Sequence, residues 1–378
     1  MTALVALSAF LLFGLNNTET AALPAYTMEL GAGPLVASLQ NSLFVLIAVL
    51  LRLPLEPVVE RKGSRFAMIA GALGYTAPCL FLAGATELWY IVLLRLAQAF
   101  GLALFQPSVA QYLTVASPTE TLGKRLGIVR FATTASLMVG PVTIFPLVDA
   151  HSYSAFFGAL ALAGACGTAV ALALPHEQAS PTTPLERRTT DTLPPLRAQA
   201  LLLATPLLLA LGYSVVMNFG QTLAAEVLAG HNNGLLFACV SAGGLAGSLI
   251  AGWATDAFGA KRSVACTVAS NGLGLLCMAL GPSVEAALAG ALLCGAGYFG
   301  AIATLIAAAG QCPSNNAGTF LARQQSALDV GMIAGGLIAG AMMQGGLPVS
   351  TAFLATSAVA GTSFFAWGIM YPKDKGKH

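Results

Sequence analysis

Four charged residues lie inside long apolar stretches of the sequence: Glu19, Arg95, Arg323 and Asp329. A charge in the middle of a bilayer costs about 2.5–3.5 kcal/mol even on a lenient insertion scale, so each of the four needs an explanation. Glu19 is the first candidate for proton coupling, because a buried carboxyl group can take up and release a proton. The alternative is a structural role for Glu19, hydrogen-bonded to Asn16 or paired with an arginine.

The other three charges suggest related roles. Arg95 must face the protein interior, where it either holds a neighbouring carboxylate in its ionised form or makes a structural ion pair. Asp329 is a second protonation site or a helix cap at a gate. Arg323 lies six residues before Asp329, which is not an i,i+4 spacing, so the two side chains are expected to meet different partners. The candidates for proton coupling are therefore Glu19, Arg95 and Asp329.

Amide and phenol side chains on the same apolar stretches are candidates for substrate binding, because ligand sites are mostly apolar with a few placed polar groups. These residues are Asn16, Asn17, Gln40, Gln98, Tyr213, Asn218 and Gln221. Polar residues in membrane helices also join one helix to another, and we expect that role for about half of them. A neutral or mildly charged amphipathic molecule fits this set better than a polyanion does.

The elements that position these residues are expected to be membrane-spanning helices. Of the 378 residues, 57% are hydrophobic and only 8% are charged, against roughly 25% charged residues in soluble domains. A spanning helix needs about 20 mostly apolar residues, and lipid leaves no other way to pair the backbone of a single segment. Twelve apolar runs are predicted to be such helices, at residues 3–27, 33–55, 66–86, 88–114, 123–148, 152–174, 198–224, 232–256, 262–281, 284–310, 317–345 and 348–371.

Basic residues gather in alternate connections between these runs, and the intervening connections carry no Lys or Arg. This asymmetry predicts that the basic connections and both termini face the cytoplasm. A polar, proline-rich segment, residues 175–197, separates six runs from six runs. The predicted fold is an all-α membrane protein with twelve transmembrane helices in two pseudo-symmetric six-helix bundles, residues 1–174 and 198–378, joined by a cytoplasmic linker.

One pattern recurs at the matching cytoplasmic loop of each predicted bundle. Gly252-Trp-Ala-Thr-Asp256-Ala-Phe-Gly259-Ala-Lys261-Arg262 joins the eighth and ninth runs, and Glu60-Arg61-Lys-Gly63-Ser-Arg65 joins the second and third. An acid at a helix end, a glycine for a tight reversal and basic residues after it are suited to form a charged latch between helices. The alternative is an ordinary basic loop on the cytoplasmic side.

With these motifs the sequence resembles the major facilitator superfamily, and most of all its twelve-span drug and metabolite efflux members. Gly252, Asp256, Gly259, Lys261 and Arg262 match that family's loop signature, whereas the first copy is degraded. Three further segments are similar to family motifs: Arg95-Leu-Ala-Gln98 in the fourth run, Gly140-Pro141 in the fifth, and Asp329-Val-Gly331 in the eleventh. The glycine pair that usually follows Gly140-Pro141 is replaced by Thr143-Ile144.

The resemblance implies alternating access, in which two halves rock about a central site, and it implies that Arg95 assists proton transfer. It also implies that Gly140-Pro141 bends the fifth helix, because proline removes a backbone hydrogen bond. Arg130 and Arg323 are expected near the cytoplasmic mouth. The gating candidates are Glu60, Arg61, Gly63, Arg65, Arg130, Gly140, Pro141, Gly252, Asp256, Gly259, Lys261, Arg262 and Arg323.

The expected function is proton-coupled export of a small organic molecule across an inner (cytoplasmic) membrane, by a chain that works as a monomer. Two alternatives stay open: proton-linked import of a metabolite such as a sugar or organic acid, and a membrane sensor that kept the fold without transporting. The sequence contains no nucleotide-binding glycine loop and no metal-spaced His or Cys cluster. An enzyme, a cofactor and a bound metal are therefore not expected. The net charge of +2, spread over loops, gives no indication of nucleic-acid binding.

Overall fold

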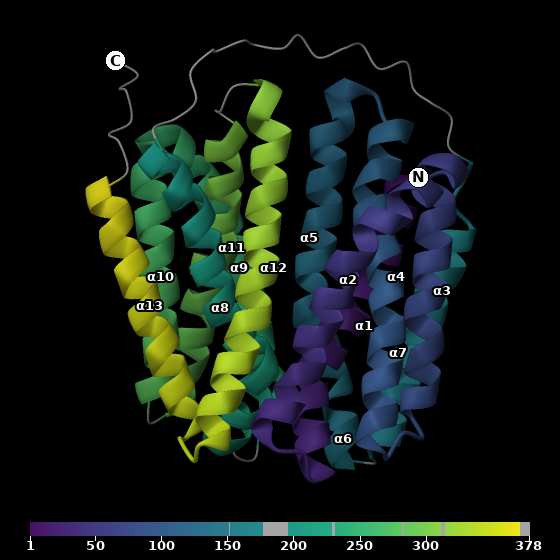
Figure 1. Cartoon of the computed structure of the whole chain (residues 1–378), viewed down its shortest axis with the longest axis horizontal. Coiled ribbons are helices and arrows are strands. Elements are labelled where there is room, and N and C mark those ends of the chain that lie inside the picture. Colours follow the sequence, from purple (N-terminus) through teal and green to yellow (C-terminus); the bar gives the residue numbers. More distant parts are fainter. Residues whose placement is uncertain (151, 177–195, 229–230, 282, 311–313, 371–378) are drawn as a thin grey trace. The chain divides into compact units, whose positions relative to one another are not determined.

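The computed structural model describes residues 1–150, 152–176, 196–228, 231–281, 283–310 and 314–370. In these residues it contains thirteen α-helices and no strand (Figure 1). The helices are α1 (Thr2–Glu29), α2 (Pro34–Lys62), α3 (Ser64–Leu82), α4 (Leu88–Ala116), α5 (Thr119–Ile144), α6 (Pro146–Ala150), α7 (Tyr153–Leu172), α8 (Leu196–Val227), α9 (Gly234–Phe258), α10 (Ala260–Leu280), α11 (Val284–Gly310), α12 (Ser314–Gln344) and α13 (Val349–Met370).

Each of the twelve predicted runs coincides with a long helix. Eleven helices in the described part of the chain are long and apolar enough to cross a membrane, judged by length and composition. The helix α1 has 28 residues but is not among the eleven. Polar residues interrupt its apolar sequence at Asn16, Asn17 and Glu19. These residues are the ones that the sequence marks as candidates for function.

The predicted run 123–148 is confirmed as one candidate span, Thr121–Val148, but the helix within it contains a break. The helix α5 ends at Ile144, and the five-residue α6 begins at Pro146. Proline has no backbone N–H to continue the helical ladder, and its fixed φ suits the first position of a new helix. Pro141 lies inside the last turn of α5, where its carbonyl accepts a hydrogen bond from the Phe145 N–H at 3.0 Å. The break therefore falls four residues after the predicted bend.

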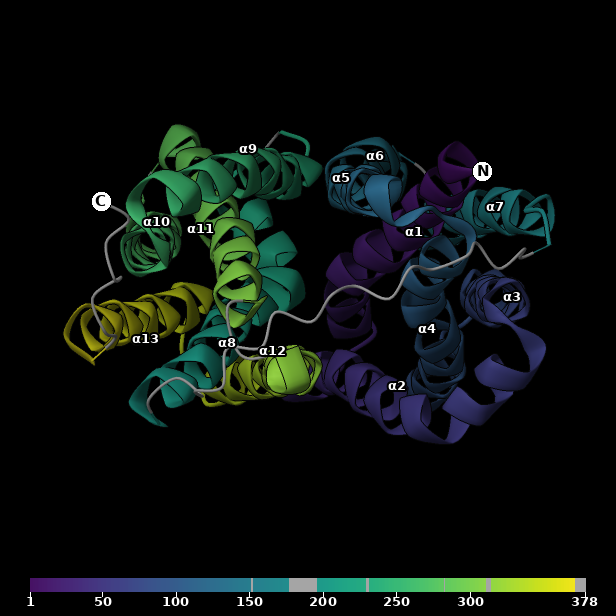
Figure 2. The same cartoon turned by 90° about the horizontal axis from the view of Figure 1, so that it is seen from above.

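Contacts between Cα atoms divide the chain into two compact units. Unit 1 comprises Met1–Leu185 with Asn232–Gly234, and unit 2 comprises Glu186–His231 with Leu235–His378. In unit 1, α1 packs on α5 and α7, and α4 packs on α3 and α2; in unit 2, α8 packs on α12 and α13, and α10 on α11 and α13 (Figure 2). The predicted linker lies almost wholly outside the described residues, so its boundaries stay a prediction.

The two signature loops adopt the same backbone geometry. Gly63 separates α2 from α3 with φ 85° and ψ 160°, and Gly259 separates α9 from α10 with φ 84° and ψ 161°. Each glycine N–H closes the preceding helix, donating to Val59 O at 2.9 Å and to Thr255 O at 3.0 Å respectively. Because residues with a Cβ avoid this region, the repeated glycine has a backbone reason.

Candidate functional site

The centre of the candidate site is an ion pair buried in unit 1. Arg95 of α4 donates from Nη1 to Oε1 of Glu19 of α1 at 3.2 Å, and neither side chain has any exposed surface. An isolated charge of either sign would be very costly in this environment, whereas a hydrogen-bonded pair is tolerated. Two of the three candidates for proton coupling therefore contact each other directly, in the ion pair that the sequence left open as a structural alternative.

Four neutral groups surround the guanidinium of Arg95. Its Nη1 also donates to the Tyr75 hydroxyl at 2.9 Å and to Gln98 Oε1 at 3.1 Å. Its Nη2 donates to the Thr20 hydroxyl at 2.6 Å and to Asn41 Oδ1 at 3.1 Å. These acceptors come from α1, α2, α3 and α4, so Arg95 joins four helices of unit 1.

The network has two further supports. The Gln98 amide nitrogen donates to the second carboxylate oxygen of Glu19 at 2.9 Å, so both oxygens of Glu19 have a partner. The Arg95 guanidinium carbon lies 3.8 Å from the centroid of the Phe44 ring, a cation–π arrangement. Both terminal nitrogens of the guanidinium are therefore held in place, whereas its buried Nε has no hydrogen-bond partner among the described residues.

A close approach of α3 to α4 places Tyr75 beside Arg95. A Cβ built on Gly101 would lie 2.5 Å from the Tyr75 backbone nitrogen, and one built on Gly71 would lie 2.8 Å from the Gly101 carbonyl. Only glycine at these positions lets the two backbones come so near, as small residues do at membrane helix interfaces. The distance between the Tyr75 hydroxyl and Arg95 depends on this contact.

Four of the predicted residues belong to the network or adjoin it: Glu19, Arg95 and Gln98 take part in it, and Asn16 joins it through Tyr75. The Tyr75 hydroxyl donates to Asn16 Oδ1 at 2.6 Å while it accepts from Arg95. Asn17 and Gln40 point elsewhere, as their amide nitrogens donate to Ser136 Oγ at 3.5 Å and Thr27 Oγ1 at 3.3 Å.

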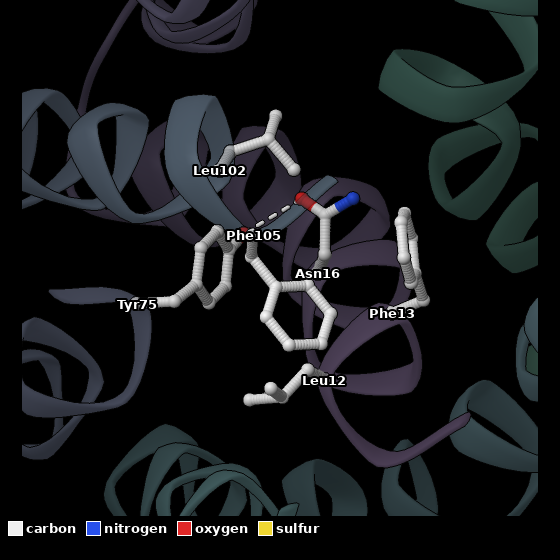
Figure 3. Close-up of a pocket in the computed structure, with 6 residues that line it drawn as sticks. All are labelled: Leu12, Phe13, Asn16, Tyr75, Leu102 and Phe105. Carbon is white, nitrogen blue, oxygen red and sulfur yellow. Dashed lines mark hydrogen bonds between the residues drawn. The ribbon is translucent and has the colours of Figure 1, made fainter. Parts of the chain in front are cut away.

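A small pocket adjoins the network at Asn16. It is lined by residues of α1, α3 and α4, and Figure 3 shows the Asn16 amide oxygen bonded to Tyr75 at its edge. The lining residues are Leu12, Phe13, Asn16, Tyr75, Leu102 and Phe105. Of these residues, Tyr75 contacts Arg95 directly and Asn16 contacts Tyr75, so the pocket borders the network of the ion pair.

The contacts described for the candidates in unit 2 lead to different partners. Asn218 bonds within its own helix, donating to Ser214 O at 2.9 Å. Tyr213 stacks on Tyr298 with ring centroids 4.1 Å apart. Asp329 is buried and accepts from Gln325 Nε2 at 3.3 Å, one turn away on α12. The buried Gln221 has a side-chain oxygen without a hydrogen-bond partner among the described residues.

The gating candidates lie mostly at helix ends. Arg65 donates to Leu174 O at 2.6 Å and to Leu172 O at 2.9 Å, which ties the start of α3 to the end of α7. The Lys261 carbonyl accepts from the Trp367 indole N–H at 3.0 Å, which ties the start of α10 to α13. The following candidates have exposed side chains or backbone: Glu60, Arg61, Arg130, Gly252, Asp256, Arg262 and Arg323.

Gly140 is the contact point between α5 and α1. A Cβ built there would overlap the Thr18 hydroxyl and would lie 3.2 Å from the Gly14 carbonyl. The neighbouring Pro141 stays within α5. This glycine therefore fixes how α5 packs beside the α1 turn that carries Glu19.

Sequence reasoning did not select four members of the network: Thr20, Asn41, Phe44 and Tyr75. Asn41 carried a signal, because it follows Gln40 on an apolar run and is equally buried. Thr20 and Tyr75 are common in membrane helices, and Phe44 is apolar, so their types alone gave no indication. Only the helix packing reveals that all four point at Arg95.

The comparisons with known proteins agree with this fold. The family model of the Major Facilitator Superfamily matches residues 5–230 and 202–378. Among proteins with curated functions, no sequence matches the chain. The structure is similar to the nucleoside transporter NupG, with a TM-score of 0.74 and 15% identity over 99% of each chain.

Two further solved structures are similar to the chain. One is a bacterial homologue of the human lysosomal transporter Spinster, with a TM-score of 0.77 and 12% identity over 97% of this chain and 95% of the other. Another is a POT family transporter in complex with 5-aminolevulinic acid, with a TM-score of 0.77 and 13% identity over 96% and 94% of the two chains. At these identities the likeness shows the fold, and the family match covers nearly the whole sequence. The chain therefore belongs to the major facilitator superfamily and is a multi-pass membrane transporter.

Proposed function

We propose that this chain is a proton-coupled secondary transporter that exports a small organic molecule by alternating access. The observation that carries the proposal is the buried Glu19–Arg95 pair with its neutral partners. Glu19 can take up and release a proton. In both protonation states of Glu19, four neutral acceptors hold the guanidinium of Arg95. The pair therefore has two protonation states without leaving the arginine unsolvated.

The energy available to such a site is sufficient for transport. One proton crossing a potential of 100 mV supplies about 2.3 kcal/mol. Each 1.4 kcal/mol corresponds to a tenfold ratio of concentrations, so one titrating carboxylate can sustain a gradient of roughly fifty-fold. A single site like Glu19 is therefore enough for useful export.

The proposed architecture is twelve spans in two six-helix bundles, residues 1–174 and 198–378. In it α1 also crosses the membrane, in addition to the eleven helices that meet the length and composition criteria. The chain lies in an inner membrane, with both termini in the cytoplasm. Six long helices in each unit support it, and so does the alternation of basic loops. Gly140, the two signature loops and Arg323 are proposed to control the rocking of the halves. We propose that the monomer is the working form.

Small organic substrates are supported by two of the similar structures, since NupG is a nucleoside transporter and the POT family transporter was solved in complex with 5-aminolevulinic acid. The site itself fits a molecule without a strong charge, since apart from Glu19 the side chains that surround Arg95 are neutral amides, hydroxyls and an aromatic ring. Asn16 and Gln98 are the polar contacts that we assign to substrate in unit 1. Tyr213, Asn218 and Gln221 remain proposed contacts in unit 2.

The test is a proton-flux assay in energised inverted membrane vesicles, read with a pH-sensitive acridine dye. A panel of a nucleoside, a dipeptide, benzamide and a cationic dye is added, and proton release with solute uptake into the vesicles indicates export. Glu19→Gln should abolish this release. The matched control is Glu29→Gln, on the same helix but with an exposed carboxylate that accepts from Tyr153, and it should behave as the unmodified protein does.

The outcomes separate the alternatives. Solute leaving the vesicles together with protons would indicate import in the cell, and the absence of flux for the whole panel would favour a sensor. Equal proton release by the Glu19→Gln variant and the unmodified protein would remove Glu19 from the mechanism.

A further inference from the structure

A proline close to the ion pair interrupts the hydrogen-bond ladder of α1. Pro24 lies inside α1 and is buried. Because proline has no backbone N–H, it cannot donate to the carbonyl four residues earlier, which is that of Thr20. Thr20 directly follows Glu19 in the sequence. The turn of α1 that carries the buried carboxylate therefore contains a carbonyl that needs a donor from outside the regular ladder.

Asn41 of α2 supplies such a donor. Its amide nitrogen donates to the Thr20 carbonyl at 2.9 Å, and Asn41 is buried. Its amide oxygen accepts from Arg95 Nη2 at 3.1 Å, and the same Nη2 donates to the Thr20 hydroxyl at 2.6 Å. Arg95, Asn41 and Thr20 therefore form a closed ring of hydrogen bonds that joins α4, α2 and α1.

This ring requires an amide side chain at position 41. An amide carries an acceptor and two donors in one plane, so a single side chain can accept from a guanidinium and donate to a carbonyl at the same time. Hydrogen bonds in a chain polarise one another, so a cation at the amide oxygen strengthens the bond that the amide nitrogen makes. The bond from Asn41 to Thr20 therefore depends on how Arg95 distributes its own bonds.

Glu19 competes with the ring for the same guanidinium. It accepts from Nη1 of Arg95, whereas Asn41 and Thr20 accept from Nη2. When Glu19 takes up a proton it loses the charge that attracts Arg95, and hydrogen bonds between neutral and charged groups then dominate at the guanidinium. Proton uptake should therefore strengthen the ring, and with it the bond from α2 to the Thr20 carbonyl.

Few titratable groups face the ion pair. From α3, Tyr75 bonds Arg95, and Cys79 lies within hydrogen-bonding distance of Glu19. The helix α7 contains no charged residue. Other charges on the surrounding helices lie eight to eleven residues along the chain from the residues of each helix that adjoin the pair, which is about 12–17 Å along a helix: Glu29, Arg52, Arg65, Glu87 and Arg130.

We infer that Asn41 is a positioning residue of the coupling site, which transmits the protonation state of Glu19 to α1 at Pro24 and to α2. The inference rests on the proposed function and deepens it, because it names how the buried pair acts on the helices around it. Proline is a common cause of bends in helices. The ring holds α1 more firmly at this point when Glu19 is protonated, and less firmly when Glu19 is ionised.

Unit 2 contains a similar bond without a charge, which provides a matched control. Pro206 lies inside α8, and the carbonyl four residues earlier is that of Leu202. The Gln324 amide nitrogen of α12 donates to this carbonyl at 3.1 Å and to the Leu305 carbonyl at 3.4 Å. The Gln324 amide oxygen has no partner among the described residues. Gln324 therefore pairs a carbonyl beside a proline without linking it to a cation.

A double-mutant cycle measures the bond to Thr20. Asn41→Leu removes this bond, whereas Pro24→Ala gives the Thr20 carbonyl a donor from its own helix. The loss caused by Asn41→Leu should therefore be smaller in the Pro24→Ala background. We expect a difference of about two- to tenfold in the equilibrium constant of unfolding, measured for the full chain in mixed micelles.

The same cycle in the Glu19→Gln background separates positioning from a structural role. A neutral side chain at position 19 stands for the protonated carboxyl group, so the coupling between positions 41 and 24 should increase by about twofold in the equilibrium constant. A bond with a structural role alone would give equal coupling in both backgrounds.

Proton flux in inverted vesicles, with the solute panel described above, gives the functional readout. Asn41→Leu and Pro24→Ala should both change the pH dependence of proton release. Gln324→Leu and Pro206→Ala should leave that pH dependence as it is in the unmodified protein. If Asn41→Leu does not fold, the comparison of Pro24→Ala with Pro206→Ala decides: a changed pH dependence in Pro24→Ala alone supports the inference, and equal pH dependences contradict it.

The inference is overturned if Asn41→Leu and Pro24→Ala are additive, if their coupling does not change in the Glu19→Gln background, or if both variants keep the pH dependence of the unmodified protein. A failure of the proposed function gives a different result. The unmodified protein would then show no proton flux with any solute of the panel, while the coupling would still depend on position 19. Proton-coupled flux together with an additive cycle would remove the role of Asn41 alone.

Discussion

Unit 1 and unit 2 use the same contact between their third and fourth long helices. A Cβ on Gly101 of α4 would lie 2.5 Å from the Tyr75 nitrogen, and a Cβ on Gly297 of α11 would overlap the Asn271 nitrogen. Tyr75 and Asn271 each follow their turn glycine by the same number of residues. The two units can therefore be compared position by position along these helices.

The compared positions carry different chemistry. Arg95, six residues before Gly101, corresponds to Ala291, and Gln98 corresponds to Cys294. Both unit 2 residues are buried, and Asn271 donates its amide to the Cys294 carbonyl at 3.2 Å where unit 1 has a charged network. The same backbone arrangement thus holds an ion pair in one unit and neutral groups in the other. The ion pair is not needed to build this helix packing, which favours a functional reason for it.

The largest expected effect comes from removing Arg95. Arg95→Met should destabilise the protein by about 3–5 kcal/mol, because it leaves Glu19 buried without its cation. In unit 2, Cys294→Ala removes a neutral side chain at the corresponding region and should cost about 1 kcal/mol. Equilibrium unfolding in mixed micelles measures both.

A double variant decides the cause of that loss. Arg95→Met combined with Glu19→Gln has no buried charge and should be more stable than Arg95→Met alone by about 2 kcal/mol. If Glu19→Gln lowers the free energy of unfolding further instead, Arg95 stabilises the protein through packing. The difference between the two units would then not be electrostatic.

The glycines Gly63 and Gly259 test whether the turns of the two signature loops are equivalent. Gly63→Ala and Gly259→Ala should each cost about 1–3 kcal/mol, because φ near +85° with ψ near 160° is a region that only glycine occupies readily. The two losses should agree closely, since the dihedral angles agree. The same unfolding titration measures them, and a difference above about 1 kcal/mol would argue against a common frame.

A smaller effect is expected from the Tyr75 hydroxyl. Tyr75→Phe removes one acceptor of Arg95 and the donor to Asn16, and should cost about 1 kcal/mol. It should also alter the pH dependence of proton flux in inverted vesicles. The unit 2 counterpart, Asn271→Ser, should give a similar loss of stability without altering that pH dependence, because in the part of unit 2 that the structure describes its bonds go to the neutral Cys294. An altered pH profile in the Asn271 variant would contradict the assignment of coupling to unit 1.

The helices and the buried charges could be predicted from the sequence for physical reasons. A span must be apolar over its whole length, so twelve long runs identify twelve long helices, and a charge within a run is conspicuous. The contact between Glu19 and Arg95 could not be predicted from the sequence, because it depends on how α1 packs against α4. The break at Phe145 was missed because hydropathy continues through it, although Pro146 marked it.

A face of small residues on a helix can be recognised in the sequence, but the helix that packs against this face is harder to predict. Gly331 and Gly335 are four residues apart in the sequence, a spacing that predicts a flat face on one side of a helix, and in the structure Cβ atoms there would meet the Leu207 and Leu211 carbonyls of α8. This face is therefore used inside unit 2. Sequence spacing identifies a face that can approach another helix closely, but the choice among neighbouring helices depends on the tertiary arrangement.

The smallest expected effect on stability concerns the acids of the signature loops. Glu60 and Asp256 are both exposed, so Glu60→Gln and Asp256→Asn should each change stability by less than about 0.5 kcal/mol. A role in gating requires that flux falls nonetheless, and more for Asp256, because its loop retains the full signature. Unfolding and flux are measured on the same preparations. Unchanged flux in both variants would mean that these loops only form the turns at Gly63 and Gly259 and take no part in gating. A loss of flux confined to Asp256→Asn would place the gate in unit 2, whereas the ion pair lies in unit 1.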